Sequence, residues 1–232
     1  ISVENISKSF GGVNALQQVS MTVRRGEIHC LAGENGSGKS TLIKVISGYY
    51  RPDSGTIRIE GRTFTSLTPA ESIRHGVQVI YQDFSLFPNL SVMENLALNA
   101  EVARGSHLVS YRRMRETAQQ AVEKIGLDVD MNARVADLSV ADRQMIAIAR
   151  ALAKNPKLLL CDEPTGALDY NTGKQILKLL QDTCRTGGMT VIIVTHNAAL
   201  ADMADRVIRF KSGKVIDQTQ NSNPTPIENI EW

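Results

Sequence analysis

Alternating apolar and polar residues near the start of the chain mark short strands at residues 3–6, 19–23 and 56–59. Turn-forming residues separate these segments, namely glycines at 11–12 and a Pro-Asp-Ser-Gly run at 52–55. Short strands joined by such turns are typical of antiparallel pairing. The pattern therefore predicts a small antiparallel β region at the beginning of the chain.

Continuous apolar runs mark a second group of strands, at residues 28–32, 77–81, 158–161 and 190–195. A helix is expected between the last two runs, at about residues 172–186. A strand, a helix and a second strand in this order are typical of a parallel sheet. The expected fold class is therefore α/β.

The stretch from about residue 91 to residue 154 contains no strand-like run. Apolar residues recur there at helical spacing, over residues 110–125 and 140–154. Capping boxes, in which a threonine or serine precedes a glutamate by three positions, indicate helix starts at Thr68 and Ser91. This stretch is therefore expected to form an inserted helical subdomain.

The expected organisation is a core made of residues 1–90 and 155–217, a helical subdomain at residues 91–154, and a C-terminal tail at residues 218–232. The tail is rich in Asn, Pro and Thr and has no periodicity. We expect it to lie over the surface.

Composition narrows the class of protein. With 232 residues, of which 42% are hydrophobic, the chain is long enough to bury a full core. The 26 basic and 24 acidic residues give a formal net charge of +2, so no nucleic-acid partner is expected. Two of the three cysteines lie in apolar runs, which suits reduced thiols in a cytoplasmic protein. The apolar runs are far shorter than the roughly 18 residues of a transmembrane helix, so membrane association is expected through a partner.

The run GENGSGKS, from Gly33 to Ser40, fits the pattern G-x-x-x-x-G-K-[ST] at every fixed position and joins a strand-like run to a helical one. Glycines let backbone N–H groups point at phosphate oxygens, while Lys39 reaches the β- and γ-phosphates and Ser40 can bind Mg²⁺. A Gly-rich turn that merely connects two elements is the alternative. The candidate nucleotide-binding residues are Gly33, Asn35, Gly36, Ser37, Gly38, Lys39, Ser40 and Thr41.

Polar side chains follow three of the apolar runs. Asp162 and Glu163 end one run, where a pair of acids is poorly placed unless a cation such as Mg²⁺ is nearby. An aspartate there can hold the metal, and a neighbouring acid can polarise the attacking water. His196 and Gln82 end two other runs, and parallel sheets gather ligand groups at the carboxyl ends of their strands. Solvated acids and a structural histidine are the plainer alternatives.

The pair Leu138-Ser139, followed by a helical run and then by the strand that ends in two acids, resembles the signature segment of ABC-transporter ATPase domains. The resemblance covers nearly the whole chain. It implies a phosphate-loop NTPase (RecA-like) core with an antiparallel β subdomain and an inserted α-helical subdomain, and it implies ATP and Mg²⁺ as cofactors. It also implies a head-to-tail nucleotide sandwich, as a homodimer or heterodimer, which works with transmembrane permease subunits at the inner face of the cell membrane.

The same resemblance implies roles for individual side chains. Glu163 resembles the catalytic base, and His196 resembles the switch histidine. Gln82 resembles the glutamine loop that senses the transmembrane partner. The implied catalytic residues are Glu163, His196, Gln82 and Lys39, the implied metal ligands are Ser40, Gln82 and Asp162, and the further nucleotide-binding residues are Phe10, Ser139 and Asp169.

The signature segment departs from the usual Leu-Ser-Gly-Gly-Gln, because Val140, Ala141 and Asp142 follow Ser139. This variant resembles the ATPases of monosaccharide importers, whereas residues from about 156 to 232 resemble those that pair with macrolide- or lipoprotein-type export permeases. The chain is therefore expected to be a mosaic of the two types. Ser139 and Asp142 also fit a variant capping box. The plainer interpretation of Ser139 is therefore an ordinary helix cap.

The leading hypothesis is the ATP-binding and ATP-hydrolysing subunit of an ABC transporter, in which dimer closure on Mg-ATP drives a separate permease, with sugar import favoured. An export-type ATPase is one alternative. A regulatory half-site that binds nucleotide with weak or no hydrolysis is the other.

Overall fold

The fold is seen in a computed structural model that describes residues 1–83, 85–103 and 109–231. It contains the antiparallel sheet that the sequence predicts, with strand order β2-β1-β4-β5. These strands are β1 (Ser2–Phe10), β2 (Val13–Thr22), β4 (Ser54–Ile59) and β5 (Arg62–Phe64). Strands β1 and β2 are longer than expected, because register shifts between them interrupt the alternation of apolar and polar residues.

A second sheet has six strands in the order β10-β9-β3-β8-β7-β6. Its strands are β3 (Ile28–Ala32), β6 (Val77–Ile80), β7 (Leu158–Asp162), β8 (Thr190–Thr195), β9 (Arg206–Lys211) and β10 (Lys214–Gln220). All pairs are parallel except β9 with β10, which is antiparallel. The parallel sheet is confirmed, and because β3, β7 and β8 are buried along their whole length, their sequences are continuous apolar runs.

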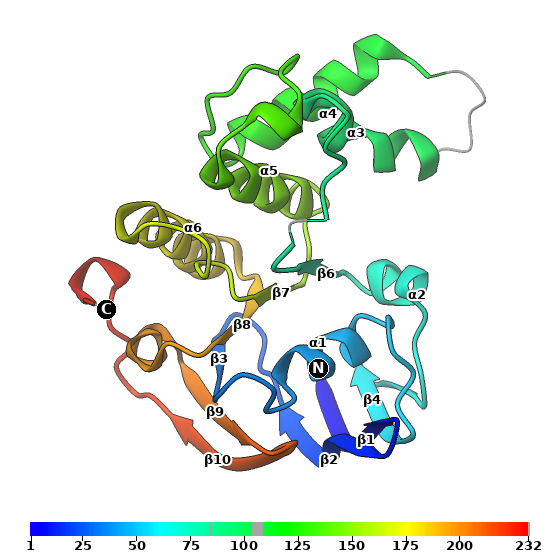
Figure 1. The fold of residues 1–232 in the computed structure, drawn as a ribbon, viewed down its shortest axis with the longest axis vertical. Coiled ribbons are helices and arrows are strands. Elements are labelled where there is room, and N and C mark those ends of the chain that lie inside the picture. The colour runs from blue at the N-terminus through cyan, green and yellow to red at the C-terminus, as the bar shows by residue number, and fades with distance from the viewer. Residues whose placement is uncertain (84, 104–108, 232) are drawn as a thin grey trace.

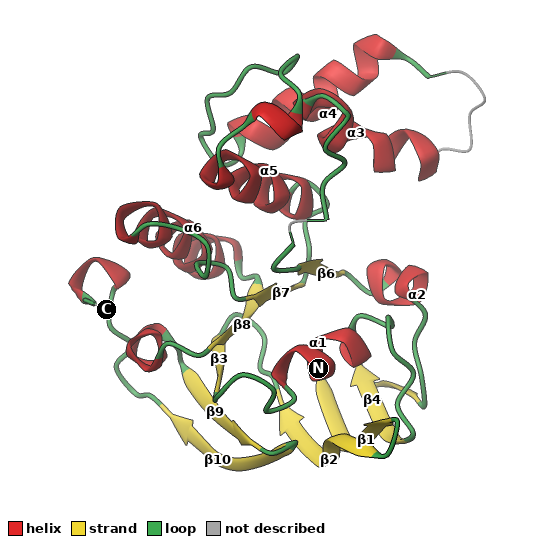
Figure 2. Ribbon diagram, in the orientation of Figure 1, coloured by secondary structure: helices red, strands yellow, loops and turns green. Residues whose placement is uncertain are grey.

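Six α-helices accompany the sheets over the described residues: α1 (Lys39–Ile46), α2 (Pro69–Arg74), α3 (Val92–Ala103), α4 (Tyr111–Glu123), α5 (Val140–Leu152) and α6 (Tyr170–Gly187). The capping boxes at Thr68 and Ser91 are both formed. Figure 1 shows α3 and α4 at one end of the molecule, away from the two sheets, with α5 between this pair and the second sheet. Figure 2 shows the same division, with strands gathered at the opposite end.

Helix α1 fills the space between the two sheets. Its side chains Leu42, Ile43 and Ile46 belong to one apolar cluster with residues of β1 and of the second sheet. On the other face of the second sheet, α5 and α6 pack through residues such as Ile148 and Leu177. Helix α5 also contributes Ile146 and Ala149 to the core of the helical group, so this one helix joins that group to the sheet.

The C-terminal segment does not match the expected surface tail. Strand β10 runs to Gln220, past the expected boundary at residue 218, and a 3₁₀ turn at Ile227–Asn229 packs against α6. Ile227 and Ile230 are buried in the core. The side chain of Gln181 accepts a hydrogen bond from the backbone N–H of Ile227 at 3.1 Å and donates one to the Thr225 carbonyl at 3.3 Å. Single isoleucines in a polar stretch form no periodic pattern, so the sequence does not predict that this segment is buried.

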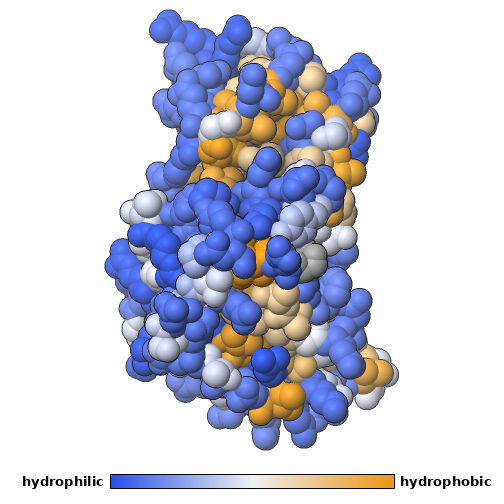
Figure 3. Space-filling model, turned by 90° about the vertical axis from the view of Figure 1, so that its left-hand side faces the viewer, coloured by the Kyte–Doolittle hydropathy of each residue, from blue (hydrophilic) through white to orange (hydrophobic). Residues whose placement is uncertain are grey.

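Side chains at the surface repeat this division. The face that Figure 3 shows has apolar residues gathered over its upper, helical part, whereas polar residues cover most of the part below. None of the helices in the described ranges combines the length and the apolar character that crossing a membrane requires. Cys30, Cys161 and Cys184 are buried and form no disulfide.

Candidate functional site

The run from Gly33 to Ser40 forms the turn between β3 and α1, which is the context that a phosphate-binding loop requires. Gly33 and Gly38 both have positive φ angles. A Cβ atom at Gly33 would lie 2.4 Å from the Phe210 carbonyl oxygen, and one at Gly38 would lie 2.5 Å from the Ala15 carbonyl oxygen. Only glycine fits these two positions. The loop is therefore held tightly against the neighbouring backbone.

Lys39 lies inside the curl of this loop, with 4% of its surface exposed. Its ammonium group donates hydrogen bonds to the carbonyl oxygens of Gly33 at 2.6 Å and Glu34 at 2.8 Å. Burial lowers the pKa of Lys39, and the nearby Glu163 and Asp162 carboxylates oppose that shift. A desolvated cation at a helix N-terminus, where the first backbone N–H groups have no partners within the helix, is a suitable receptor for a phosphate chain.

Asp162 ends β7 beside the first turn of α1. The Ser40 hydroxyl donates a hydrogen bond to Asp162 Oδ1 at 2.9 Å, and Asp162 is only 6% exposed. Burial raises the pKa of Asp162, and the hydrogen bond from Ser40 opposes the shift. The half-buried Ser40 hydroxyl and the buried Asp162 carboxylate form a hard oxygen donor set, which fits Mg²⁺ bound to nucleotide phosphates.

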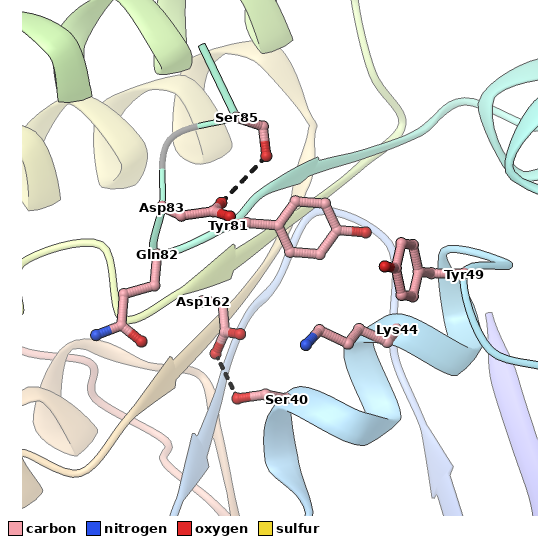
Figure 4. Close-up of a pocket in the computed structure, with 8 residues that line it drawn as sticks. All are labelled: Ser40, Lys44, Tyr49, Tyr81, Gln82, Asp83, Ser85 and Asp162. Carbon is pink, nitrogen blue, oxygen red and sulfur yellow. Dashed lines mark hydrogen bonds between the residues drawn. The ribbon is translucent and has the colours of Figure 1, made fainter.

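A cavity of about 620 Å³ opens beside this pair. Figure 4 shows Gln82, Asp162 and Ser40 on one side of it and the rings of Tyr49 and Tyr81 on the other. The remaining lining residues are Lys44, Asp83 and Ser85. Motifs and strand ends in the sequence indicate Gln82, Asp162 and Ser40 as site residues. They do not indicate the other five, although Lys44 lies one helical turn after Ser40 and Tyr81 directly precedes Gln82.

Glu163 and His196 meet at the ends of β7 and β8. The His196 Nδ1 atom lies 3.0 Å from Glu163 Oε1. The other carboxylate oxygen, Oε2, is buried and has no hydrogen-bond partner among the described residues. Glu163 also has a positive φ of 50°, a conformation that non-glycine residues rarely adopt and that concentrates at functional sites. A fixed carboxylate with one oxygen free can accept a proton from a water molecule.

The remaining candidates lie outside this cluster. Phe10, at the end of β1, is 41% exposed and packs edge-on against Tyr50 with ring centroids 4.9 Å apart, so its ring offers a stacking surface. Asp169 caps α6 by accepting hydrogen bonds from the backbone N–H and the hydroxyl of Thr172, which lower the pKa of Asp169.

Ser139 caps α5, as the sequence predicts. Its hydroxyl oxygen accepts the backbone N–H of Asp142 at 3.1 Å, and its hydroxyl group donates to Asp142 Oδ2 at 2.7 Å. These hydrogen bonds stay within the first turn of the helix. Over the described ranges, no hydrogen bond joins Ser139 to the phosphate loop of the same chain.

Comparison with known proteins adds independent information. A family model described as "ABC transporter" matches residues 16–166. The ribose import ATP-binding protein RbsA 2 of Escherichia coli O157:H7 is 38% identical over 96% of this chain and 44% of its own length. The ribose import ATP-binding protein RbsA 1 of Rubrobacter xylanophilus is 40% identical over 93% of this chain and 43% of its own. The chain thus spans less than half the length of these curated relatives.

Solved structures resemble the fold over nearly its whole length. A dimeric post-hydrolysis state of the ATP-binding cassette MJ0796, bound to ADP and Pi, has a TM-score of 0.83 and 31% identity over 94% of this chain and 97% of that one. A nucleotide-free ATP-binding cassette from an ABC transporter has a TM-score of 0.83 and 27% identity over 95% of this chain and 91% of that one. Because the ribose-import relatives align with both halves of the chain, the comparisons do not support the expected mosaic with an exporter-type segment.

Proposed function

Because the chain belongs to the ABC transporter family, we propose that it is the ATP-binding and ATP-hydrolysing part of a transporter. The observation that carries this proposal is the meeting of four groups at one edge of the sheet. They are the phosphate loop with Lys39, the pair Ser40 and Asp162, the side chain of Gln82, and the pair Glu163 and His196. A nucleotide site and a candidate base are thus contiguous.

We assign phosphate binding, metal binding and proton transfer to different residues of the site, according to the chemistry of each side chain. Lys39 and the loop N–H groups bind the phosphates, and Phe10 offers its exposed ring to the base. Ser40, Asp162 and Gln82 would hold Mg²⁺, which supplies charge stabilisation on the phosphoryl oxygens. Glu163 accepts a proton from water, and His196 holds its Oε1 atom in place.

We further propose that two ATPase domains form one functional unit. The α5 N-terminus presents backbone N–H groups at an exposed position, but the hydrogen bonds of Ser139 leave it unconnected to the phosphate loop in its own chain. A second domain would complete the site by bringing its own α5 to this loop. The similar cassette MJ0796 is dimeric in its state bound to ADP and Pi, which supports this arrangement.

A groove beside the site suits a permease partner. Its volume is about 340 Å³, and its lining includes the exposed apolar side chains Tyr49, Ile73 and Phe87. Arg150 and Lys154 also line it, and no carboxylate does among its described residues. Burial, together with Arg150, lowers the pKa of Lys154. Apolar surface with a cationic rim favours an amphipathic segment that carries an acid.

The names of the relatives give the direction of transport that we propose. The curated relatives at 38–40% identity are named as ribose import ATP-binding proteins. We therefore propose that this chain energises uptake of a monosaccharide, from the cytoplasmic face of the membrane, through permease subunits. An export role has no comparable support.

Substitution of Glu163→Gln tests the enzymatic proposal. We expect ATP hydrolysis to fall by about 10²–10⁴-fold, because the amide cannot accept the proton from water. Nucleotide binding should persist, since Glu163 contacts no residue of the phosphate loop by a hydrogen bond. The two quantities are measured by phosphate release and by retention of labelled ATP on gel filtration.

The unaltered chain provides the control for the two-domain unit. Its ATPase rate should rise more steeply than linearly with protein concentration, because two copies must meet. Hydrolysis by the Glu163→Gln chain at the normal rate would show that Glu163 is not the base. A wild-type chain that binds ATP but hydrolyses none at any concentration would instead favour the regulatory half-site.

A further inference from the structure

A short chain of hydrogen bonds joins the residue before Gln82 to helix α1. The Tyr81 hydroxyl lies 3.1 Å from Ser47 Oγ, and the Ser47 hydroxyl donates to the carbonyl oxygen of Lys44 at 3.1 Å. A serine hydroxyl has one hydrogen to give. Since that hydrogen goes to Lys44, the Tyr81 hydroxyl must be the donor to Ser47.

Burial makes this contact costly to lose. Ser47, at the C-terminal cap of α1, is buried, so its hydroxyl has little access to water that could replace the tyrosine as a partner. A buried polar group that loses its hydrogen-bond partner destabilises the folded state. The tyrosine ring is therefore held by its hydroxyl as well as by packing.

The two elements joined by these hydrogen bonds also contain the residues that we propose as metal ligands. Helix α1 begins with Lys39 and Ser40, and Gln82 directly follows Tyr81. Tyr81 lines the cavity that holds Ser40, Gln82 and Asp162, as Figure 4 shows, and it also lines the neighbouring groove. Movement of the Tyr81 ring would thus shift the backbone that carries Gln82.

We propose that Tyr81 is a positioning residue for Gln82, which it holds at a fixed place relative to Ser40 and Asp162 through its hydrogen bond to Ser47. The proposal rests on the proposed function, because it takes Gln82 as a group on the metal side of the nucleotide.

The test uses Tyr81→Phe and Ser47→Ala, each of which removes one member of the hydrogen bond with little change of shape. Tyr111→Phe is the matched control, because it deletes the same oxygen from an exposed residue at the start of α4. The probe is ADP with increasing MgCl₂, and the readout is thermal stabilisation of the protein rather than activity. The quantity compared is the Mg²⁺ concentration at half-maximal stabilisation.

We expect this Mg²⁺ concentration to rise at least about threefold in Tyr81→Phe and Ser47→Ala, and to stay unchanged in Tyr111→Phe. The double variant should show no more than the larger single effect, since both remove the same bond. Stabilisation by ADP without Mg²⁺ should be the same in all variants, because the phosphate loop is intact.

Two other results would overturn the proposal. An unchanged Mg²⁺ requirement in both single variants, or effects that add in the double variant, would show that the bond does not position Gln82. A wild-type chain that gains no stability from ADP at any Mg²⁺ concentration would count against the proposed function as well, so the two failures are distinguishable.

Discussion

The phosphate loop and the start of α5 are both helix N-termini with free backbone N–H groups, but they are built in different ways. The phosphate loop is pressed against the backbone at Gly33 and Gly38 and encloses the ammonium of Lys39. The α5 terminus lies at the surface, with Val140 41% exposed, and among the described residues the Ser139 side chain forms hydrogen bonds only with Asp142.

This difference shows which half of the proposed site is complete within one chain. Groups that are already held in place bind a ligand without the entropic cost of ordering them. The phosphate loop meets that condition. The α5 terminus has only its own cap, so it becomes part of a phosphate site when another surface is placed against it. If only the phosphate loop is complete within one chain, substitutions there should weaken ADP binding by a single chain, whereas substitutions at the α5 terminus should reduce ATP hydrolysis without changing that binding.

The largest effect is expected from Gly38→Ala. A Cβ atom there would lie 2.5 Å from the Ala15 carbonyl oxygen, at a φ of +104°. We expect a loss of about 3 kcal/mol in the free energy of unfolding. ADP binding should weaken by about a hundredfold, which is about 3 kcal/mol. Urea denaturation and fluorescent-nucleotide titration measure the two changes.

Gly36→Ala is the matched control, since Gly36 has a φ of +76° in the same loop but nothing lies within 4 Å of a Cβ placed there. It should cost only about 1 kcal/mol, the strain of a positive φ. Equal losses in the two variants would mean that backbone contact does not hold the loop, and the contrast with α5 would disappear.

The next effect is expected from Ser139→Ala, compared with Ser110→Ala at the cap of α4. Both serines accept a backbone N–H in the first turn of a helix, so each substitution should cost about 1 kcal/mol of stability. Only Ser139→Ala should also reduce ATP hydrolysis, by about tenfold, because only that terminus would face a phosphate.

ADP binding at low protein concentration should be unchanged in both serine variants, because a single chain binds ADP through its phosphate loop. Hydrolysis that falls equally in both would indicate a general loss of stability. Weaker ADP binding in Ser139→Ala alone would show that the α5 terminus acts on the phosphate loop of its own chain.

The sequence predicts the phosphate loop more completely than the surroundings that hold it. Strand β3 begins and ends where its apolar run does, because it is buried on both faces and a glycine follows it. Strands β9 and β10 were missed, since β9 carries Arg206, Arg209 and Lys211 and β10 is mostly exposed. Continuous apolar runs do not mark such strands, of which β10 forms the edge of the sheet and β9 lies next to it.

Site residues could likewise be predicted where an apolar strand marks their place. Asp162, Glu163 and His196 could be predicted because each lies at the end of an apolar strand, and parallel strands end at one edge. The contact between Tyr81 and Ser47 could not be predicted, because it joins residues 34 positions apart, and local sequence patterns do not encode which distant residues meet. The burial of Ile227 and Ile230 against α6 is hidden from the sequence for the same reason.

The smallest effect is expected from Asp162→Asn, which tests whether the buried Asp162 carboxylate beside the phosphate loop lowers the free energy of unfolding. Burial raises the pKa of Asp162 above its value in the unfolded chain, so the folded protein binds this proton more tightly. Stability from this group is therefore full below the unfolded pKa of about 3.9 and is lost as pH rises through the folded pKa. Asp162→Asn, which stays neutral, should raise the free energy of unfolding without nucleotide at pH 7.5 by about 1 kcal/mol.

The same substitution at Asp169 should have the opposite sign, because hydrogen bonds from Thr172 lower the pKa of Asp169 and its carboxylate form is the one that stabilises the folded chain. Urea denaturation of both variants at pH 7.5 measures the pair. If Asp162→Asn destabilises the chain as Asp169→Asn does, the buried carboxylate is satisfied by its own surroundings. The Ser40 and Asp162 pair would then be a structural contact rather than a prepared metal site, and the phosphate loop would differ from the α5 terminus through its backbone contacts and the enclosed Lys39 alone.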